Sequence, residues 1–144
     1  MTIQHIAVIG AGTMGNGITQ VCAVSGYKVT MIDVMPDALK KGLATIEKSL
    51  NKLAEKNKIT AQQKDSALAA ITTSGELSAA AQADFIIEAA TENPDLKLKI
   101  FRDLDALAKP DVILASNTSS ISLTKIGGVT KRPDKVIGMH FMNP

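Results

Sequence analysis

The chain has 144 residues, an apolar share of 45% and a formal net charge of +2, from 16 Lys and Arg against 14 Asp and Glu, which suits one ordinary domain with a sizeable core. The small charge excess, with three Phe, one Tyr and no Trp, argues against a nucleic-acid partner, because such partners need clustered cations and stacking rings. One cysteine excludes an internal disulfide. The sequence has neither a signal peptide nor an apolar run of the ~20 residues that span a bilayer. We therefore expect a soluble, cytoplasmic protein with no membrane partner.

Short β-branched runs alternate with longer helical stretches, a pattern typical of a parallel sheet with crossover helices. The predicted strands are residues 3–9, 28–32, 70–73, 84–88, 112–115 and 135–139. Runs such as FIIEAA and VILAS are apolar almost throughout, as expected of strands buried on both faces. The predicted fold class is therefore α/β, a doubly wound parallel sheet.

A glycine-rich segment joins the first predicted strand to a helical pattern. Its residues are Gly10, Ala11, Gly12, Thr13, Met14 and Gly15. In this motif Gly10 permits a tight turn, Gly12 lets a pyrophosphate approach the backbone, and Gly15 allows close packing of helix and strand. The free N–H groups at the start of the helix then attract the phosphates. The segment predicts a Rossmann-type dinucleotide site.

Asp33 ends the second predicted strand, 21 residues after Gly12. A carboxylate at this place binds the ribose hydroxyls of the adenosine half and repels a 2′-phosphate. Val34 and Met35 follow, with no arginine to hold such a phosphate. We therefore predict NAD as the cofactor, and no metal.

Two other reactive side chains are given structural roles. Cys22 shares a helical stripe with Ile18, Val21 and Ser25, so we expect it to pack in the core. His5 starts the first strand, far from the carboxyl ends where ligands bind, and is expected at the surface.

A helical insertion of about residues 36–69 separates the second and third predicted strands. Its apolar stripe consists of Leu39, Leu43, Ile46, Leu50 and Leu53. The opposite face is basic, with Lys40, Lys41, Lys48, Lys52 and Lys56. Pro36 suits the first turn, and Thr60 is predicted to cap a second helix that ends near residue 69. The insertion adds to the minimal nucleotide fold and is placed to reach a ligand.

A further helix is predicted over residues 94–108, between the cap Asn93 and Pro110. Its expected apolar stripe is Leu96, Ile100, Leu104 and Leu107.

Polar side chains follow the fourth, fifth and sixth predicted strands, whose carboxyl ends line one crevice in a doubly wound sheet. They are Glu88, Glu92, Asn93, Ser116, Asn117, Ser119, His140 and Asn143. Removal of hydride from an alcohol carbon needs a base for the hydroxyl proton, and His140 has the position of one. A structural histidine at a strand end remains the alternative. We give Glu88 no role beyond the polarity of its strand end.

The motif series GAGTMG, Asp33, EAATEN, SNTSS and MHFMNP, in this order and across almost the whole chain, resembles the 3-hydroxyacyl-CoA dehydrogenase family, in particular its 3-hydroxybutyryl-CoA type. The resemblance implies NAD-dependent interconversion of an (S)-3-hydroxyacyl-CoA and a 3-ketoacyl-CoA, with an acyl-CoA as the substrate partner.

The resemblance also implies roles for individual residues. His140 corresponds to the catalytic base, and Ser119 to the residue bonded to the substrate oxygen and close to the cofactor. Asn117 lies near the nicotinamide, and the further cofactor contacts are Glu92, Lys97 and Asn143. Ser49 and Lys56 correspond to coenzyme A contacts on one face of the inserted helix, although a merely solvated basic face is the alternative.

Residues 1–144 are expected to form one NAD-binding domain that lacks the family's carboxyl-terminal helical domain, which closes the substrate site and makes a homodimer. The acid that orients the catalytic histidine lies beyond the matched motifs. We therefore expect the isolated chain to bind NAD and to turn over poorly.

Two other functions are compatible with the residues. The chain could belong to an NAD-linked dehydrogenase of another hydroxy acid, although this leaves the basic inserted helix without a purpose. It could also be a non-catalytic relative of the kind found among lens crystallins, although such a protein has no need of a polar crevice with Ser119, Asn117 and His140.

Overall fold

The computed structural model describes residues 2–90, 93–117 and 123–139. These residues form a six-stranded parallel sheet of order β3-β2-β1-β4-β5-β6, which confirms the predicted α/β class. The strands are β1 His5–Ile9, β2 Lys28–Ile32, β3 Ile71–Ser74, β4 Phe85–Glu88, β5 Ile113–Ser116 and β6 Val136–Gly138. Each predicted strand is present: β2 has both predicted ends, and the other strands differ from the prediction by one or two residues at one or both ends.

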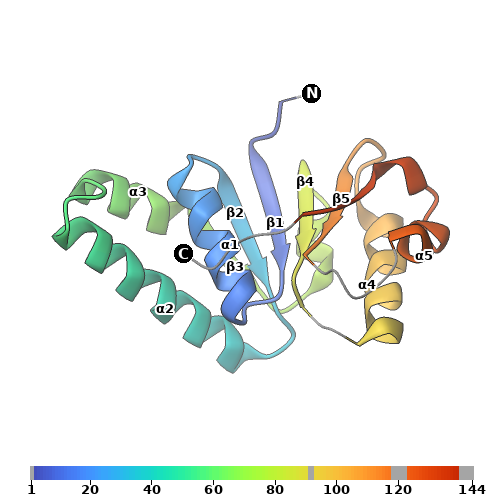
Figure 1. Cartoon of the computed structure of the whole chain (residues 1–144), viewed down its shortest axis with the longest axis horizontal. Helices are drawn as coiled ribbons and strands as arrows, with labels where there is room; N and C mark the ends of the chain where they lie inside the picture. Colours follow the sequence, from blue (N-terminus) through green and yellow to red (C-terminus); the bar gives the residue numbers. More distant parts are fainter. Residues whose placement is uncertain (1, 91–92, 118–122, 140–144) are drawn as a thin grey trace.

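Helices cover both faces of this sheet (Figure 1). They are α1 Thr13–Val24, α2 Pro36–Glu55, α3 Ala61–Ala70, α4 Pro94–Leu107 and α5 Leu123–Gly128, with short 3-10 turns η1 Leu77–Ala80 and η2 Pro133–Lys135. The sequence pattern did not predict α5, η1 or η2. Among the described residues, no helix has the length and apolar character that a membrane span requires.

Alternate residues of the central strand β1 belong to two separate cores. Ile6 and Val8 pack with residues of α1 and α2 on one face. Ala7 and Ile9 pack on the other face with residues of α4. Burial on both faces explains why the central strands are apolar at almost every position.

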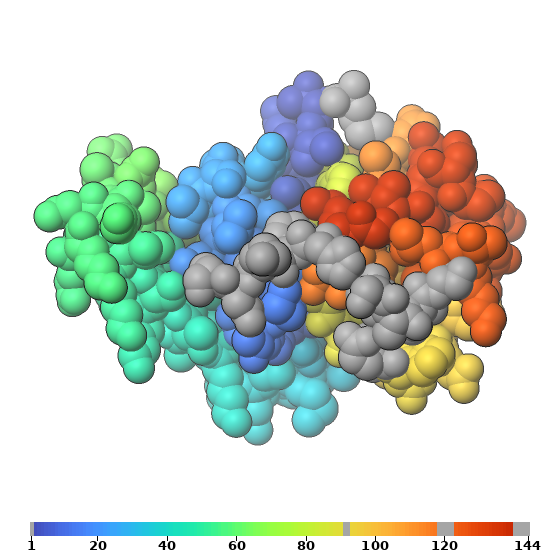
Figure 2. Space-filling model, in the orientation of Figure 1, coloured from blue at the N-terminus to red at the C-terminus, as the bar shows by residue number. Residues whose placement is uncertain are grey.

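The insertion forms α2 and α3, which project as a lobe beyond α1 (Figure 2). Ile46 and Leu50 of the predicted stripe are fully buried. Gly42, which the stripe did not include, is also buried, and a Cβ there would lie 2.9 Å from the carbonyl oxygen of Ala11. The absence of a side chain thus lets α2 lie against the glycine-rich loop.

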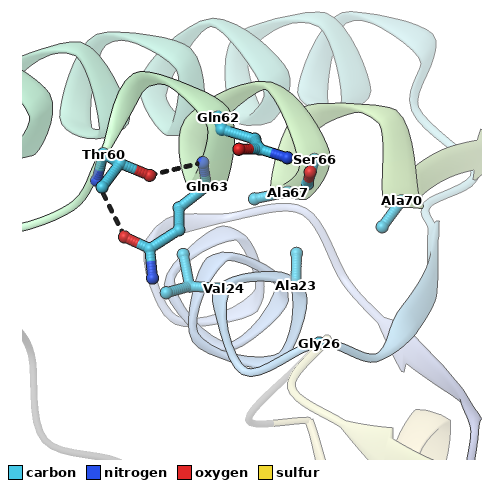
Figure 3. A pocket seen from close by; sticks show the side chains of 9 residues that line it. All are labelled: Ala23, Val24, Gly26, Thr60, Gln62, Gln63, Ser66, Ala67 and Ala70. Carbon is cyan, nitrogen blue, oxygen red and sulfur yellow. Dashed lines mark hydrogen bonds between the residues drawn. The ribbon is translucent and has the colours of Figure 1, made fainter.

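The predicted cap of α3 is confirmed. The Thr60 hydroxyl accepts the Gln63 N–H at 3.0 Å, and the Gln63 side chain accepts the Thr60 N–H at 2.8 Å (Figure 3). This reciprocal capping box defines the start of the helix.

Two predicted helix stripes are partly wrong. In α4 the buried residues are Lys97, Phe101 and Leu104, whereas Leu96 is 47% exposed, because the sheet contacts a helix face rotated from the expected one.

In α1, Cys22 is buried as expected, and burial raises the pKa of its thiol to about 11. Val21, assigned to the same stripe, is 46% exposed.

Arg132 joins the end of α4 to the start of β5. Its guanidinium donates to Asp105 Oδ1 at 2.7 Å and to four backbone carbonyl oxygens, so that all five N–H groups have acceptors. Those carbonyls belong to Asp105, Ala108, Lys109 and Val112. The side chains of Arg132 and Asp105 are 9% and 10% exposed.

We expect Arg132→Leu to lower the free energy of unfolding by about 3 kcal/mol, because it removes the cation that pairs with the nearly buried Asp105 carboxylate and five hydrogen bonds with it. Chemical denaturation measures this loss. Asp103→Asn is the matched control, since it removes an exposed ion pair with Lys99 on the same helix and should cost less than about 0.5 kcal/mol. Equal losses of unfolding free energy in the two variants would contradict this structural role of Arg132.

Asp84 holds the start of β1. Its carboxylate lies 2.7 Å from Lys109 Nζ and accepts the N–H groups of Gln4 and His5 at 3.0 Å each. The Lys109 hydrogen bond and then these two N–H groups lower the pKa of Asp84 well below its usual range. Because the pKa is lower in the folded state, this contribution to stability is complete above the unfolded pKa and is lost as the pH falls below it.

Asp84→Asn should therefore lower the free energy of unfolding by about 1–2 kcal/mol at neutral pH. The difference from the wild type should shrink as the pH falls below about 4, because the Asp84 carboxyl takes up a proton in the unfolded chain at a pH where the folded chain still excludes it. Urea unfolding across this pH range measures it. A difference that stays constant down to pH 2 would exclude the carboxylate as its source.

Candidate functional site

The glycine-rich loop makes a tight turn between β1 and α1. Gly10 has a φ of +112°, and a Cβ there would lie 2.7 Å from the Ala89 carbonyl oxygen. A Cβ on Gly15 would collide with the Gly10 carbonyl oxygen. At Gly12, by contrast, no described atom lies within 4 Å of the Cβ position. Gly10 and Gly15 thus shape the turn, whereas Gly12 leaves its outer side open to a ligand.

The amino-terminal end of α1 follows this open position. Gly12 is the N-cap and brings no side chain to the free N–H groups, and the first turn carries no acidic residue. The unpaired N–H groups of a helix start attract phosphate. The end of α1 therefore fits the diphosphate of a dinucleotide.

Asp33 lies beside the loop, directly after β2. Its Oδ2 accepts the Ala11 N–H at 3.0 Å and its Oδ1 accepts the Met35 N–H at 2.9 Å. Each carboxylate oxygen has room for a second hydrogen bond. Asp33 therefore positions the loop and keeps acceptor capacity for ribose hydroxyls.

A pocket of about 570 Å³ opens next to Asp33. Most of its other lining residues are apolar and come from β2, α4 and the segment that joins β2 to α2, among them Ile32, Val34, Met35, Leu96 and Ile100. Val34 and Met35 are 79% and 60% exposed. This apolar pocket beside the Asp33 carboxylate suits an adenine ring.

A second pocket, of about 340 Å³, lies on the other side of the loop. It is lined by Gly12, Thr13, Met14, Ala89, Ala90, Lys97 and Asn117. The Lys97 side chain is 1% exposed, and its Nζ lies 2.7 Å from Oε1 of the fully buried Glu88. The buried Glu88 carboxylate thus holds the Lys97 ammonium at one wall of this pocket. The sequence pattern did not assign this role to Glu88.

A hollow of about 320 Å³ between α1 and α3 has a different character (Figure 3). Its nine lining residues are apolar, glycine or neutral polar, and none carries a charge. It lacks the groups that bind a dinucleotide. Among the described residues, no three His, Cys, Asp or Glu side chains gather as a metal site would require.

The structure brings most of the predicted cofactor residues that it describes to one crevice. Residues 10–15 form the loop, Asp33 lies on one side of it, and Lys97 and Asn117 lie on the other. The other predicted catalytic and cofactor residues, Glu92, Ser119, His140 and Asn143, lie outside the described residues. His5 lies away from the crevice at the start of β1, half-buried, with Nε2 2.8 Å from Thr30 Oγ1.

The predicted coenzyme A residues lie on α2 and at its end. Ser49 is half-buried, and its hydroxyl accepts the Gln20 side-chain N–H at 3.0 Å, which joins α2 to α1. Lys56 is exposed at the carboxyl-terminal cap of α2. Neither residue lines the pockets beside the loop.

Comparison with known proteins gives a consistent result. Residues 5–144 match the family described as "3-hydroxyacyl-CoA dehydrogenase, NAD binding domain". The chain is 46% identical over 142 residues to a 3-hydroxybutyryl-CoA dehydrogenase of Bradyrhizobium diazoefficiens, covering 99% of this chain and 48% of that protein. It is 48% identical over 144 residues to a probable 3-hydroxybutyryl-CoA dehydrogenase of Bacillus subtilis, covering 100% of this chain and 50% of that one.

The chain is also similar to a solved structure. The (S)-3-hydroxybutyryl-CoA dehydrogenase of Ralstonia eutropha superimposes with a TM-score of 0.95 at 51% identity, over 99% of this chain and 50% of that one. The chain thus spans about half the length of the relatives that it matches.

Two glycine substitutions distinguish the ligand side of the loop from its packing side. Gly12→Ala should keep the thermal stability, because the new methyl group meets no described atom, and should weaken NAD⁺ binding about tenfold or more by occupying the approach of the diphosphate. Gly15→Ala should destabilise the fold, because its methyl group meets the Gly10 carbonyl. Calorimetry and NAD⁺ titration measure both effects. Unchanged NAD⁺ affinity in a folded Gly12→Ala variant would place the dinucleotide elsewhere.

Proposed function

The chain belongs to the 3-hydroxyacyl-CoA dehydrogenase family, as its NAD-binding domain, and from this premise we propose that it forms the cofactor-binding half of an enzyme that interconverts (S)-3-hydroxyacyl-CoA and 3-ketoacyl-CoA. The proposed substrate is 3-hydroxybutyryl-CoA, after the names of the relatives at 46% and 48% identity. The observation that carries the proposal is the crevice, in which an open glycine, a helix start and Asp33 meet.

The proposed work of the described residues is to bind and orient the dinucleotide, whose nicotinamide carries the hydride. The amides at Gly12–Met14 hold the diphosphate and Asp33 accepts ribose hydroxyls. The pocket lined by Ala90, Lys97 and Asn117 receives the nicotinamide end. The adenosine half and the nicotinamide half of the dinucleotide then lie on opposite sides of the glycine-rich loop.

We propose that His140 takes the proton of the substrate hydroxyl while hydride passes from the carbon that bears this hydroxyl to NAD⁺. In the reverse reaction His140 returns the proton to the oxygen. Ser119 would bind the substrate oxygen, and Glu92 and Asn143 would contact the cofactor. These roles come from the positions of the four residues in the motif series.

On α2 we propose that Ser49 and Lys56 contact the coenzyme A part of the substrate. The exposed lysines on this helix suit the phosphates of that group, since the described face carries several cations. Residues 1–144 would act as one domain, and the part of the relatives that these residues do not match would complete the substrate site and form the homodimer.

A chimera tests the proposed reaction. The matched half of the Ralstonia eutropha enzyme is replaced by residues 1–144, to which it is 51% identical. We expect acetoacetyl-CoA-dependent oxidation of NADH by the chimera, and a loss of rate by about 10²-fold or more in its His140→Gln variant with NADH affinity retained. The 144-residue chain alone should bind NAD⁺ but turn over far more slowly.

A folded chimera that oxidises NADH no faster than its His140→Gln variant would contradict the proposal. Turnover of other 3- or 2-hydroxy acids without coenzyme A, in place of acetoacetyl-CoA, would instead assign the crevice to a different dehydrogenase.

A further inference from the structure

Glu88 lies beside the point where the strand order reverses, between β1 and β4. It is the last residue of β4, where its backbone is in register with Ile9 of β1 on one side and Ser116 of β5 on the other. Ligands of doubly wound sheets bind outside the carboxyl ends of the strands at this place. Its side chain is nonetheless 0% exposed, so it acts from beneath the pocket.

Among the described residues, donors from three different segments bind this one carboxylate. Oε1 accepts Lys97 Nζ of α4 at 2.7 Å and the Ser116 hydroxyl of β5 at 3.0 Å. Oε2 accepts the backbone N–H of Ala90, in the segment after β4, at 2.8 Å. Ala90 and Lys97 both line the pocket beside Gly12. Glu88 is therefore bonded to two separate parts of the pocket wall.

Stability alone does not account for this arrangement. A buried ion pair loses most of its attraction to the cost of removing both charges from water, and an apolar pair of similar volume is often at least as stable. What the pair does provide is a fixed position for the ammonium group. Lys97 Nζ has three N–H donors, of which one binds Glu88 at 2.7 Å and another lies 3.5 Å from Ser116 Oγ. The third has no acceptor among the described residues and is left for an acceptor in the pocket.

We propose that Glu88 is a positioning residue for the nicotinamide half of NAD, which acts by fixing the Lys97 ammonium and the backbone at Ala90 in the pocket wall, with Ser116 as its own support. The Glu88 carboxylate itself does not touch the cofactor. This inference rests on the proposed placement of NAD in the crevice. It predicts that loss of Glu88 weakens the binding of the nicotinamide end while the adenosine end, held beside Asp33, is unaffected.

The test compares Kd values of NAD⁺ and AMP for variants of the 144-residue chain, measured by calorimetry below the unfolding temperature. Glu88→Gln should raise the Kd of NAD⁺ about tenfold, because a charge-assisted contact is lost, and should leave the Kd of AMP within about twofold. Asp33→Asn is the reciprocal control and should weaken both ligands. Asp105→Asn is the structural control, since it breaks the buried Arg132 pair at the other end of α4 and should change neither Kd.

A double variant tests whether Glu88 acts through Lys97. Because the two residues form one unit, Glu88→Gln combined with Lys97→Met should weaken NAD⁺ binding little beyond Lys97→Met alone. Fully additive losses would contradict the positioning role. Ser116→Ala provides a milder change, for use if Glu88→Gln does not fold, and should raise the Kd of NAD⁺ about threefold with AMP unchanged.

Unchanged NAD⁺ affinity in the folded Glu88→Gln and Ser116→Ala variants would overturn the inference, and so would parallel losses for NAD⁺ and AMP. These outcomes leave the proposed function intact as long as the wild-type chain binds NAD⁺. A wild-type chain without saturable NAD⁺ binding would instead refute the placement of the cofactor, and the inference with it.

Discussion

The organisation of the molecule depends on the turn at Gly10. β1 pairs with β2 on one side and with β4 on the other, and the chain must leave its end without striking the end of β4. Only a residue without Cβ can adopt a φ of +112° so close to the Ala89 carbonyl. With this turn in place, α1 packs on one face of the sheet and α4 on the other. Residues from the first turns of both helices, Thr13 of α1 and Lys97 of α4, line the pocket beside Gly12.

Each side of that crevice recognises a different kind of chemical group. Asp33 and the apolar pocket beside it suit a ribose and an adenine ring, and the start of α1 suits a diphosphate. Across the loop, Lys97 contributes a cation whose counter-charge is buried beneath it. The polar groups of the site are therefore held by the sheet and by α4, so that little reorganisation is needed when a dinucleotide binds.

The strands, the loop and the inserted helices could be predicted because they depend on local signals. Apolar runs, three spaced glycines, Pro36 and the Thr60 cap act over a few residues, and the structure has the corresponding elements. The pairing of Lys97 with Glu88 could not be predicted in this way, because a lysine is counted with the exposed side chains until a buried carboxylate from another element is placed opposite it. The same reason explains the error on α4, where Phe101 is buried beside Lys97 while Leu96 and Ile100 line the pocket. Gly42 was overlooked because its role is a tertiary contact with the Ala11 backbone.

We propose that the dinucleotide spans the loop, with its diphosphate at the start of α1. The crystal structure of the 144-residue chain with bound NAD⁺ tests it most directly. We expect diphosphate oxygens within hydrogen-bonding distance of the amides at Gly12–Met14, and adenosine ribose hydroxyls on the Asp33 carboxylate. A diphosphate bound elsewhere, such as in the uncharged hollow between α1 and α3, would contradict it.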